Sequence, residues 1–88
     1  NSLGILIAAR QALAETEQFT NDALYAALLS VAERAEVKSG RVLWPVRIAI
    51  TGTAVTPGGA TEIAELLGKE ETLARMDASI AKLQRELA

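Results

Sequence analysis

The chain has 88 residues, enough for one small domain that buries roughly 60 to 65% of its unfolded surface around one modest core. It contains no cysteine and no histidine, which excludes disulfides, thiolate or imidazole metal sites and the usual pairs of nucleophile and general base, so the chain alone is not expected to be an enzyme. A net charge of -2 argues against adhesion to DNA or RNA through a global basic field.

Hydropathy indicates a helical protein outside membranes. Hydrophobic residues make up 50% of the chain but aromatic residues only 3%, so the core must consist of Leu, Ile, Val and Ala, which favours an all-α fold. Charged or polar residues interrupt the apolar stretches well before the roughly 20 residues that a bilayer requires, and we expect a soluble, cytoplasmic protein. The chain begins at Asn1 rather than at a methionine, and its first helix is apolar on more than one side, as expected for a piece of a larger protein.

Two helices are predicted in the first 35 residues. The first runs from about Leu3 to Glu15. The second follows Thr20, a residue type that caps helix N-termini, with Asp22 near the positive helix end and Phe19 placed to pack on Leu24 as a hydrophobic staple. The apolar face predicted for this helix consists of Leu24, Leu28, Val31 and Ala35.

The next segment is an apolar run around a proline. Lys38, Ser39 and Gly40 form a break, after which Pro45 predicts a kink or a fresh helix start, because proline lacks the backbone N–H that the helix needs. The β-branched residues of the run also fit a strand, but no partner strand exists in the sequence and Gly52 fits a left-handed helix cap. We therefore predict a helix that ends at Gly52.

The last third of the chain predicts a loop and two helices. The loop covers residues 53–59, a short helix runs from about Ala60 to Leu67, and Gly68 ends it. The final helix covers roughly residues 69–87, with a possible ion pair between Glu71 and Arg75 across one turn. Its core-facing seam is predicted to contain Leu73, Met76, Ile80, Leu83 and Leu87. The whole chain is thus predicted to be a compact bundle of about five helices.

Positive charge is concentrated in the middle of the sequence. Arg34, Lys38, Arg41 and Arg47 occupy one window in which Glu36 is the sole acidic residue. Such a window is compatible with a locally basic patch, and also with helix positions that merely face water.

Candidate chemistry lies between Arg47 and Ala60. Arginine offers a planar cation and a fork of hydrogen-bond donors to an unpaired base, and Gly58 and Gly59 allow backbone N–H groups to approach a base or a phosphate closely beside Pro57. The residues alone favour a second interpretation, in which Arg47 lays its aliphatic stem over the core and the Thr-Pro-Gly-Gly turn only starts a helix.

Residues 40–71, GRVLWPVRIAITGTAVTPGGATEIAELLGKEE, resemble the C-terminal part of bacterial glutamyl-tRNA synthetases. The resemblance is carried by W-P-V-R-x-A-x-T-G, the following T-P-G and L-L-G-K-E, and it covers nearly the whole chain. It implies that residues 1–88 form the C-terminal anticodon-binding subdomain of a class I synthetase, with the anticodon loop of tRNA(Glu) and the upstream domains of the same synthetase as partners.

The resemblance also implies site residues. Arg47 and the turn residues Thr56, Pro57 and Gly58 match those that form the pocket for the third anticodon base, a cytosine in tRNA(Glu). Where the family often has bulky apolar residues after the turn, this chain has Gly59 and Ala60, so backbone contacts replace a side-chain wall there. Arg41 or Lys38 is expected to hold an adjacent phosphate.

No cofactor is expected in this chain. The H-I-G-H and K-M-S-K-S type signatures that class I synthetases use for ATP are absent, so ATP, magnesium and glutamate would bind elsewhere in a parent enzyme that attaches glutamate to tRNA. The alternative from another class is a non-catalytic helical module that binds a protein partner through an amphipathic groove.

Overall fold

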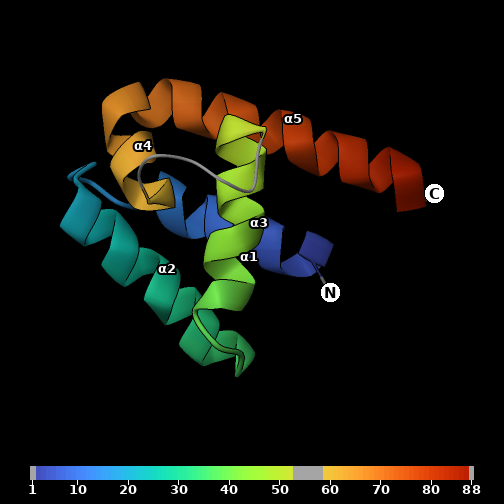
Figure 1. Cartoon of the computed structure of the whole chain (residues 1–88), viewed down its shortest axis with the longest axis horizontal. Helices are drawn as coiled ribbons and strands as arrows, with labels where there is room; N and C mark the ends of the chain where they lie inside the picture. The colour runs from blue at the N-terminus through green and yellow to red at the C-terminus, as the bar shows by residue number, and fades with distance from the viewer. Residues whose placement is uncertain (1, 53–58, 88) are drawn as a thin grey trace.

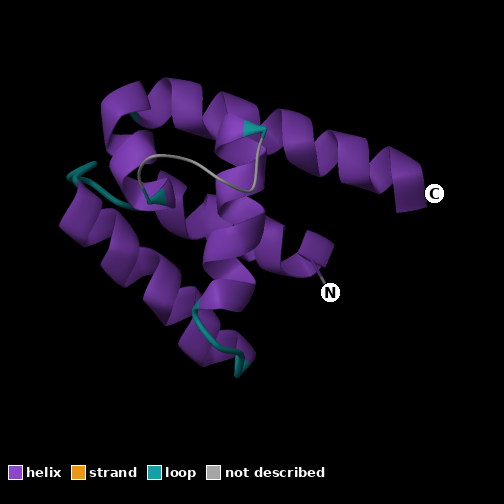
Figure 2. Ribbon diagram, in the orientation of Figure 1, coloured by secondary structure: helices purple, strands orange, loops and turns teal. Residues whose placement is uncertain are grey.

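The computed structural model describes residues 2–52 and 59–87, and the described residues form five α-helices and no strand (Figures 1 and 2). The helices are α1 (Ser2–Ala14), α2 (Asn21–Ala35), α3 (Gly40–Thr51), α4 (Ala60–Leu67) and α5 (Lys69–Leu87). Helix α1 contacts α2, α3 and α5, and α3 crosses α1 in the view of Figure 1. The prediction of an all-α bundle of about five helices is confirmed.

The core is built from the residue types that the composition predicts. Its buried hydrophobic residues come from all five helices, and all of them except Met76 are Leu, Ile, Val or Ala. The buried members are Leu6, Ala9, Leu13, Leu24, Leu28, Val31, Ala32, Val42, Val46, Ile50, Ala60, Ala64 and Met76. One predicted member is wrong: Ala35 is exposed and Ala32 is buried instead, because the last residue of α2 has already turned away from the core.

Helix α2 begins and ends through local hydrogen bonds. The Thr20 hydroxyl accepts from the backbone N–H of Ala23 at 3.4 Å, which confirms the predicted N-cap. The helix ends when Glu36 adopts left-handed backbone angles (φ 58°) and its N–H donates to the carbonyls of Ala32 and Glu33. The predicted break at residues 38–40 is therefore partly wrong, because Gly40 is already the first residue of α3.

Helix α3 passes through Pro45 without a new start. It begins at Gly40, so the predicted fresh start at Pro45 is wrong. Pro45 lacks the backbone N–H that would donate to the carbonyl of Arg41. Because Arg41 is exposed, water can donate to that carbonyl instead. Gly52 ends the helix with left-handed angles (φ 78°), and its N–H donates to the Ile48 carbonyl at 2.8 Å, as predicted.

Helix α5 closes the bundle through Arg75. The Arg75 Nε donates to Glu71 Oε2 at 2.8 Å, which confirms the predicted pair, and Nη1 donates to the Ile50 carbonyl near the end of α3, also at 2.8 Å. The predicted seam holds through Leu83 but fails at Leu87, which is 68% exposed. The carboxyl end of α5 extends past the other helices in Figure 1, so no neighbour covers Leu87.

A second polar link joins α5 to α1. Arg10 Nε lies 2.8 Å from Asp77 Oδ1. The pKa of Arg10 is raised above its usual value, first by the hydrogen bond to Asp77 and then by the negative charge of this carboxylate. Because Arg10 stays protonated far beyond neutral pH in any case, its positive charge is constant over the physiological range.

Candidate nucleic-acid interface

Three helices meet around a hollow of about 400 Å³ that Arg47 lines. The first turns of α2 and the first turn of α4 form two walls, and the middle of α3 forms the third. The lining residues are Asn21, Asp22, Tyr25, Leu43, Arg47, Gly59, Ala60, Thr61 and Glu62. We call this hollow the α2–α3–α4 pocket.

Arg47 reaches the pocket from a helix face that is half in the core. Val46 and Ile50 are buried on one side of α3, whereas Arg47 is half-buried and its Nε atom is buried. One turn before it, Leu43 lines the same wall, since residues four positions apart share a helix face. Arg47 is thus a partly buried side chain that borders the pocket from α3.

The start of α4 supplies backbone and carboxylate groups. Gly59 is extended and Ala60 is buried at the first helical position. The first N–H groups of any α-helix lack partners within that helix, so the N–H groups at the start of α4 are potential donors to a ligand. A Cβ added at Gly59 would lie 3.7 Å from Glu62 Oε1, which shows that the Glu62 carboxylate lies near Gly59.

A hydrogen bond between side chains fixes the distance between the α2 and α4 walls. Thr61 Oγ1 donates to Asn21 Oδ1 at 2.6 Å, and the Asn21 backbone N–H donates to Glu65 Oε1 at 2.9 Å. Thr61 is only 5% exposed, so the first of these bonds is largely shielded from water. The rim of the pocket is thereby held by two links between helices that are 40 residues apart in sequence.

The predicted site residues fall into three groups. Arg47, Gly59 and Ala60 line one pocket. Thr56, Pro57 and Gly58 lie outside the described residues. Lys38 and Arg41 are exposed near the start of α3 and do not line the pocket; six residues of helical rise, about 9 Å, separate Arg41 from Arg47 along the axis.

Sequence reasoning missed the contribution of α2. Asp22 was interpreted only as a helix-end charge, and Asn21 and Tyr25 were not singled out. Helix periodicity gave no signal for Tyr25, because it lies seven residues before the buried Ala32 and so on nearly the same side of α2 as a core residue.

The described residues show neither a metal site nor a membrane span. No three His, Cys, Asp or Glu side chains among them are grouped so as to hold a metal ion. Within the same part of the chain, no helix is both long and apolar enough to cross a bilayer.

Comparisons with known proteins place the chain beside tRNA ligases. A family model described as an anticodon binding domain matches residues 1–80. The chain is 44% identical over 87 residues to the glutamate–tRNA ligase of Clostridium tetani (strain Massachusetts / E88) and 47% identical over 87 residues to that of Clostridium novyi (strain NT). Each alignment covers 99% of this chain but only 18% of the relative. The glutamate–tRNA ligase of Clostridium botulinum (strain Hall / ATCC 3502 / NCTC 13319 / Type A) is 44% identical over 84 residues, 96% of this chain and 17% of the relative.

Proposed function

Because the chain belongs to the anticodon binding domain family and is homologous to glutamate–tRNA ligases, we propose that residues 1–88 are the C-terminal anticodon-binding subdomain of a glutamyl-tRNA synthetase and that the α2–α3–α4 pocket receives an anticodon base of tRNA(Glu). The observation that carries this proposal is that Arg47 on α3 and Gly59 and Ala60 at the start of α4 line one pocket.

The chemistry of the pocket suits the edge of a base. Cytosine presents acceptors at O2 and N3 and a donor at N4, so it needs both donors and acceptors opposite it. Arg47 supplies donors, and the carboxylates of Asp22 and Glu62 supply acceptors, on different walls. Thr56, Pro57 and Gly58 complete the proposed binding surface for the third anticodon base, and Arg41 or Lys38 holds a neighbouring phosphate from the exposed end of α3.

The remaining chemistry belongs to a parent enzyme. The chain spans 18% of the length of the relatives that it matches, and its described residues offer no group of ligands for Mg²⁺. We propose that ATP, Mg²⁺ and glutamate bind in the rest of the synthetase, which works in the cytoplasm.

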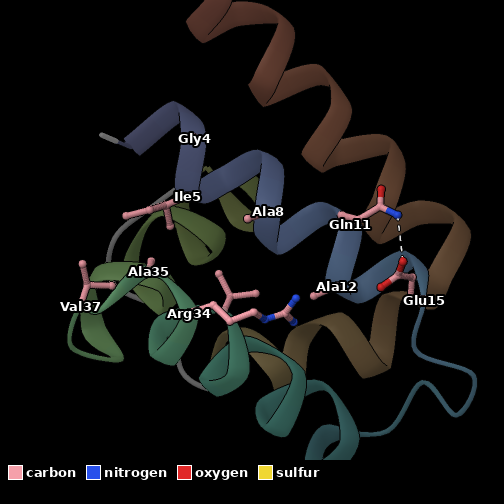
Figure 3. A pocket seen from close by; sticks show the side chains of 10 residues that line it. Gly4, Ile5, Ala8, Gln11, Ala12, Glu15, Arg34, Ala35 and Val37 are labelled. Atoms are coloured by element: carbon pink, nitrogen blue, oxygen red, sulfur yellow. Dashed lines mark hydrogen bonds between the residues drawn. The ribbon is translucent and has the colours of Figure 1, made fainter.

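The groove between α1 and α2 is the proposed contact for the upstream domains. This hollow of about 540 Å³ is lined by small and apolar residues such as Gly4, Ile5 and Ala8 on α1 and Val37 after α2 (Figure 3). Gln11 donates to Glu15 at its edge, and Arg34 borders it from α2. The groove and the α2–α3–α4 pocket share no lining residue, so both surfaces can be occupied together.

Titration of the ¹⁵N-labelled chain with an anticodon stem-loop of tRNA(Glu) tests the RNA-binding proposal. We expect shifts confined to amides of residues 47–50 and 59–62 that weaken as salt rises, because phosphate contacts release counterions. A chain that serves only as a protein-binding module would show no such shifts, and this result would refute the proposal.

Two arginines of α3 form a matched pair for the charging assay in the parent enzyme. Arg47→Ala should lower kcat/KM for tRNA about 5- to 150-fold and reduce discrimination against a tRNA altered at the third anticodon base, while KM for ATP stays unchanged. Arg41→Ala should weaken the binding of both tRNAs equally, and it should lower the slope of log affinity against log salt concentration by about one unit. Unchanged relative efficiency of the two tRNAs with Arg47→Ala would falsify the role of Arg47.

A further inference from the structure

Tyr25 is an aromatic residue whose position the core does not explain. It lies on α2 between the buried Leu24 and Leu28, it is 43% exposed, and it lines the α2–α3–α4 pocket one turn after Asn21. Its ring therefore borders the same space as Arg47, from a different helix. An exposed aromatic side chain beside an arginine is an arrangement that proteins use for unpaired bases, because bases stack on rings and accept from guanidinium groups.

The charges around the pocket favour a base over a phosphate. Among the described residues that line the pocket, Arg47 carries the one positive charge and Asp22 and Glu62 carry two negative charges, which sum to -1. A phosphate would be repelled by this sum, but a neutral base would not. Leu43 adds an apolar surface on the α3 wall, where the face of a base can also pack.

We propose that Tyr25 is a stacking residue that positions a nucleobase in the α2–α3–α4 pocket, so that Arg47 binds the edge of the base while the tyrosine ring covers its face. This inference rests on the proposed RNA-binding function and assigns a positioning role to α2, a helix that the sequence motifs do not involve.

The other large exposed aromatic side chain provides a control from the same molecule. Trp44 is 54% exposed and lies on α3 three residues before Arg47, but it lines a separate hollow with Pro45, Ile48 and Leu83. If exposure and aromatic area alone determined where a base stacks, Trp44 would be the preferred platform. The pocket geometry instead selects Tyr25, because this ring borders the same hollow as Arg47.

The test measures the affinity of the chain for the anticodon stem-loop of tRNA(Glu) with three variants. Tyr25→Ala should raise Kd about 5- to 150-fold, the range expected for loss of one stacked base. Tyr25→Phe should stay within about twofold of the parent chain, because the ring rather than the hydroxyl provides stacking. Trp44→Ala should also bind normally. In NMR spectra of the complex, the ring protons of Tyr25 should shift upfield and show contacts to base protons.

Each outcome bears on a different claim. Far-UV circular dichroism checks that every variant is folded, and Tyr25→Phe serves as the conservative variant if Tyr25→Ala is not. The stacking role is overturned if the RNA still shifts the amide signals of residues 47–50 and 59–62 but binds Tyr25→Ala with normal affinity. It is also overturned if the bound RNA shows no contacts to the Tyr25 ring in the parent chain. Either result leaves the proposed function standing. Loss of binding in Trp44→Ala alone overturns the choice of pocket. Absence of salt-sensitive binding to the parent chain overturns both proposals.

Discussion

Removal of the Thr61 hydroxyl should loosen the rim of the α2–α3–α4 pocket and lower the stability of the whole chain. Thr61→Val keeps the shape of the side chain but deletes the donor to Asn21 Oδ1, a bond of 2.6 Å. A hydrogen bond between neutral groups contributes about 0.5 to 1.5 kcal/mol net. Asn21 is half-buried, so water can partly replace the lost donor, and we expect a loss of about 1 kcal/mol. For a domain of this size the midpoint of thermal unfolding should fall by about 4 to 8 °C.

Thermal and urea unfolding followed by circular dichroism at 222 nm measure this loss. A double-mutant cycle with Asn21→Ala isolates the bond, because the backbone N–H of Asn21 can still donate to Glu65 in that variant. The coupling energy should be about 0.5 to 1 kcal/mol. Thr72→Val is the matched control: this threonine is also buried, but its acceptor, the Ala64 carbonyl, also accepts from the Gly68 N–H. The loss of stability in Thr72→Val should therefore be smaller than in Thr61→Val. Strict additivity of the two pocket variants would refute the assigned bond.

Two further variants test the fold. Gly52→Ala should cost about 1 kcal/mol through its left-handed backbone alone, since no described residue beyond its chain neighbours has an atom within 4 Å of the added Cβ. Gly4→Ala inside α1 should instead stabilise the chain by about 0.5 to 1 kcal/mol. The urea midpoints should therefore shift in opposite directions, and shifts in the same direction would contradict this expectation. Met76→Ala should cost about 2 to 5 kcal/mol because the side chain is fully buried, and Met76→Leu less than about 1.5 kcal/mol, as measured by the same unfolding curves; similar losses for both would show that no cavity is created.

The helices could be predicted from sequence where their ends depend on local chemistry. Thr20 begins a helix through its side-chain hydroxyl, and Gly52 and Gly68 end helices through their backbone N–H groups. All three partners lie within four residues, so these roles do not depend on the rest of the fold. Pro45 misled the prediction because the rule for proline counts one lost bond, while the cost in α3 depends on whether the acceptor of that bond reaches water. Leu87 was assigned to the core because periodicity identifies a helix face but not how far its neighbours extend.

The candidate site could be predicted only in part. Arg47, Gly59 and Ala60 stand near one another in a motif, and the family resemblance pointed to them. Asn21, Asp22 and Tyr25 precede that motif by about 20 residues or more, and only the packing of α2 against α4 brings them to the pocket. No local pattern encodes such a meeting between helices, so a single sequence without contacts between distant residues could not have identified the third wall.

The guanidinium of Arg75 links two helices. It donates to the Glu71 carboxylate on its own helix, α5, and to the Ile50 carbonyl in the last turn of α3. The orientation of the helix that carries Arg47 is consequently sensitive to substitutions on α5. If the α2–α3–α4 pocket receives a base as proposed, substitutions at positions 71 and 75 should therefore change base discrimination although neither residue lines the pocket.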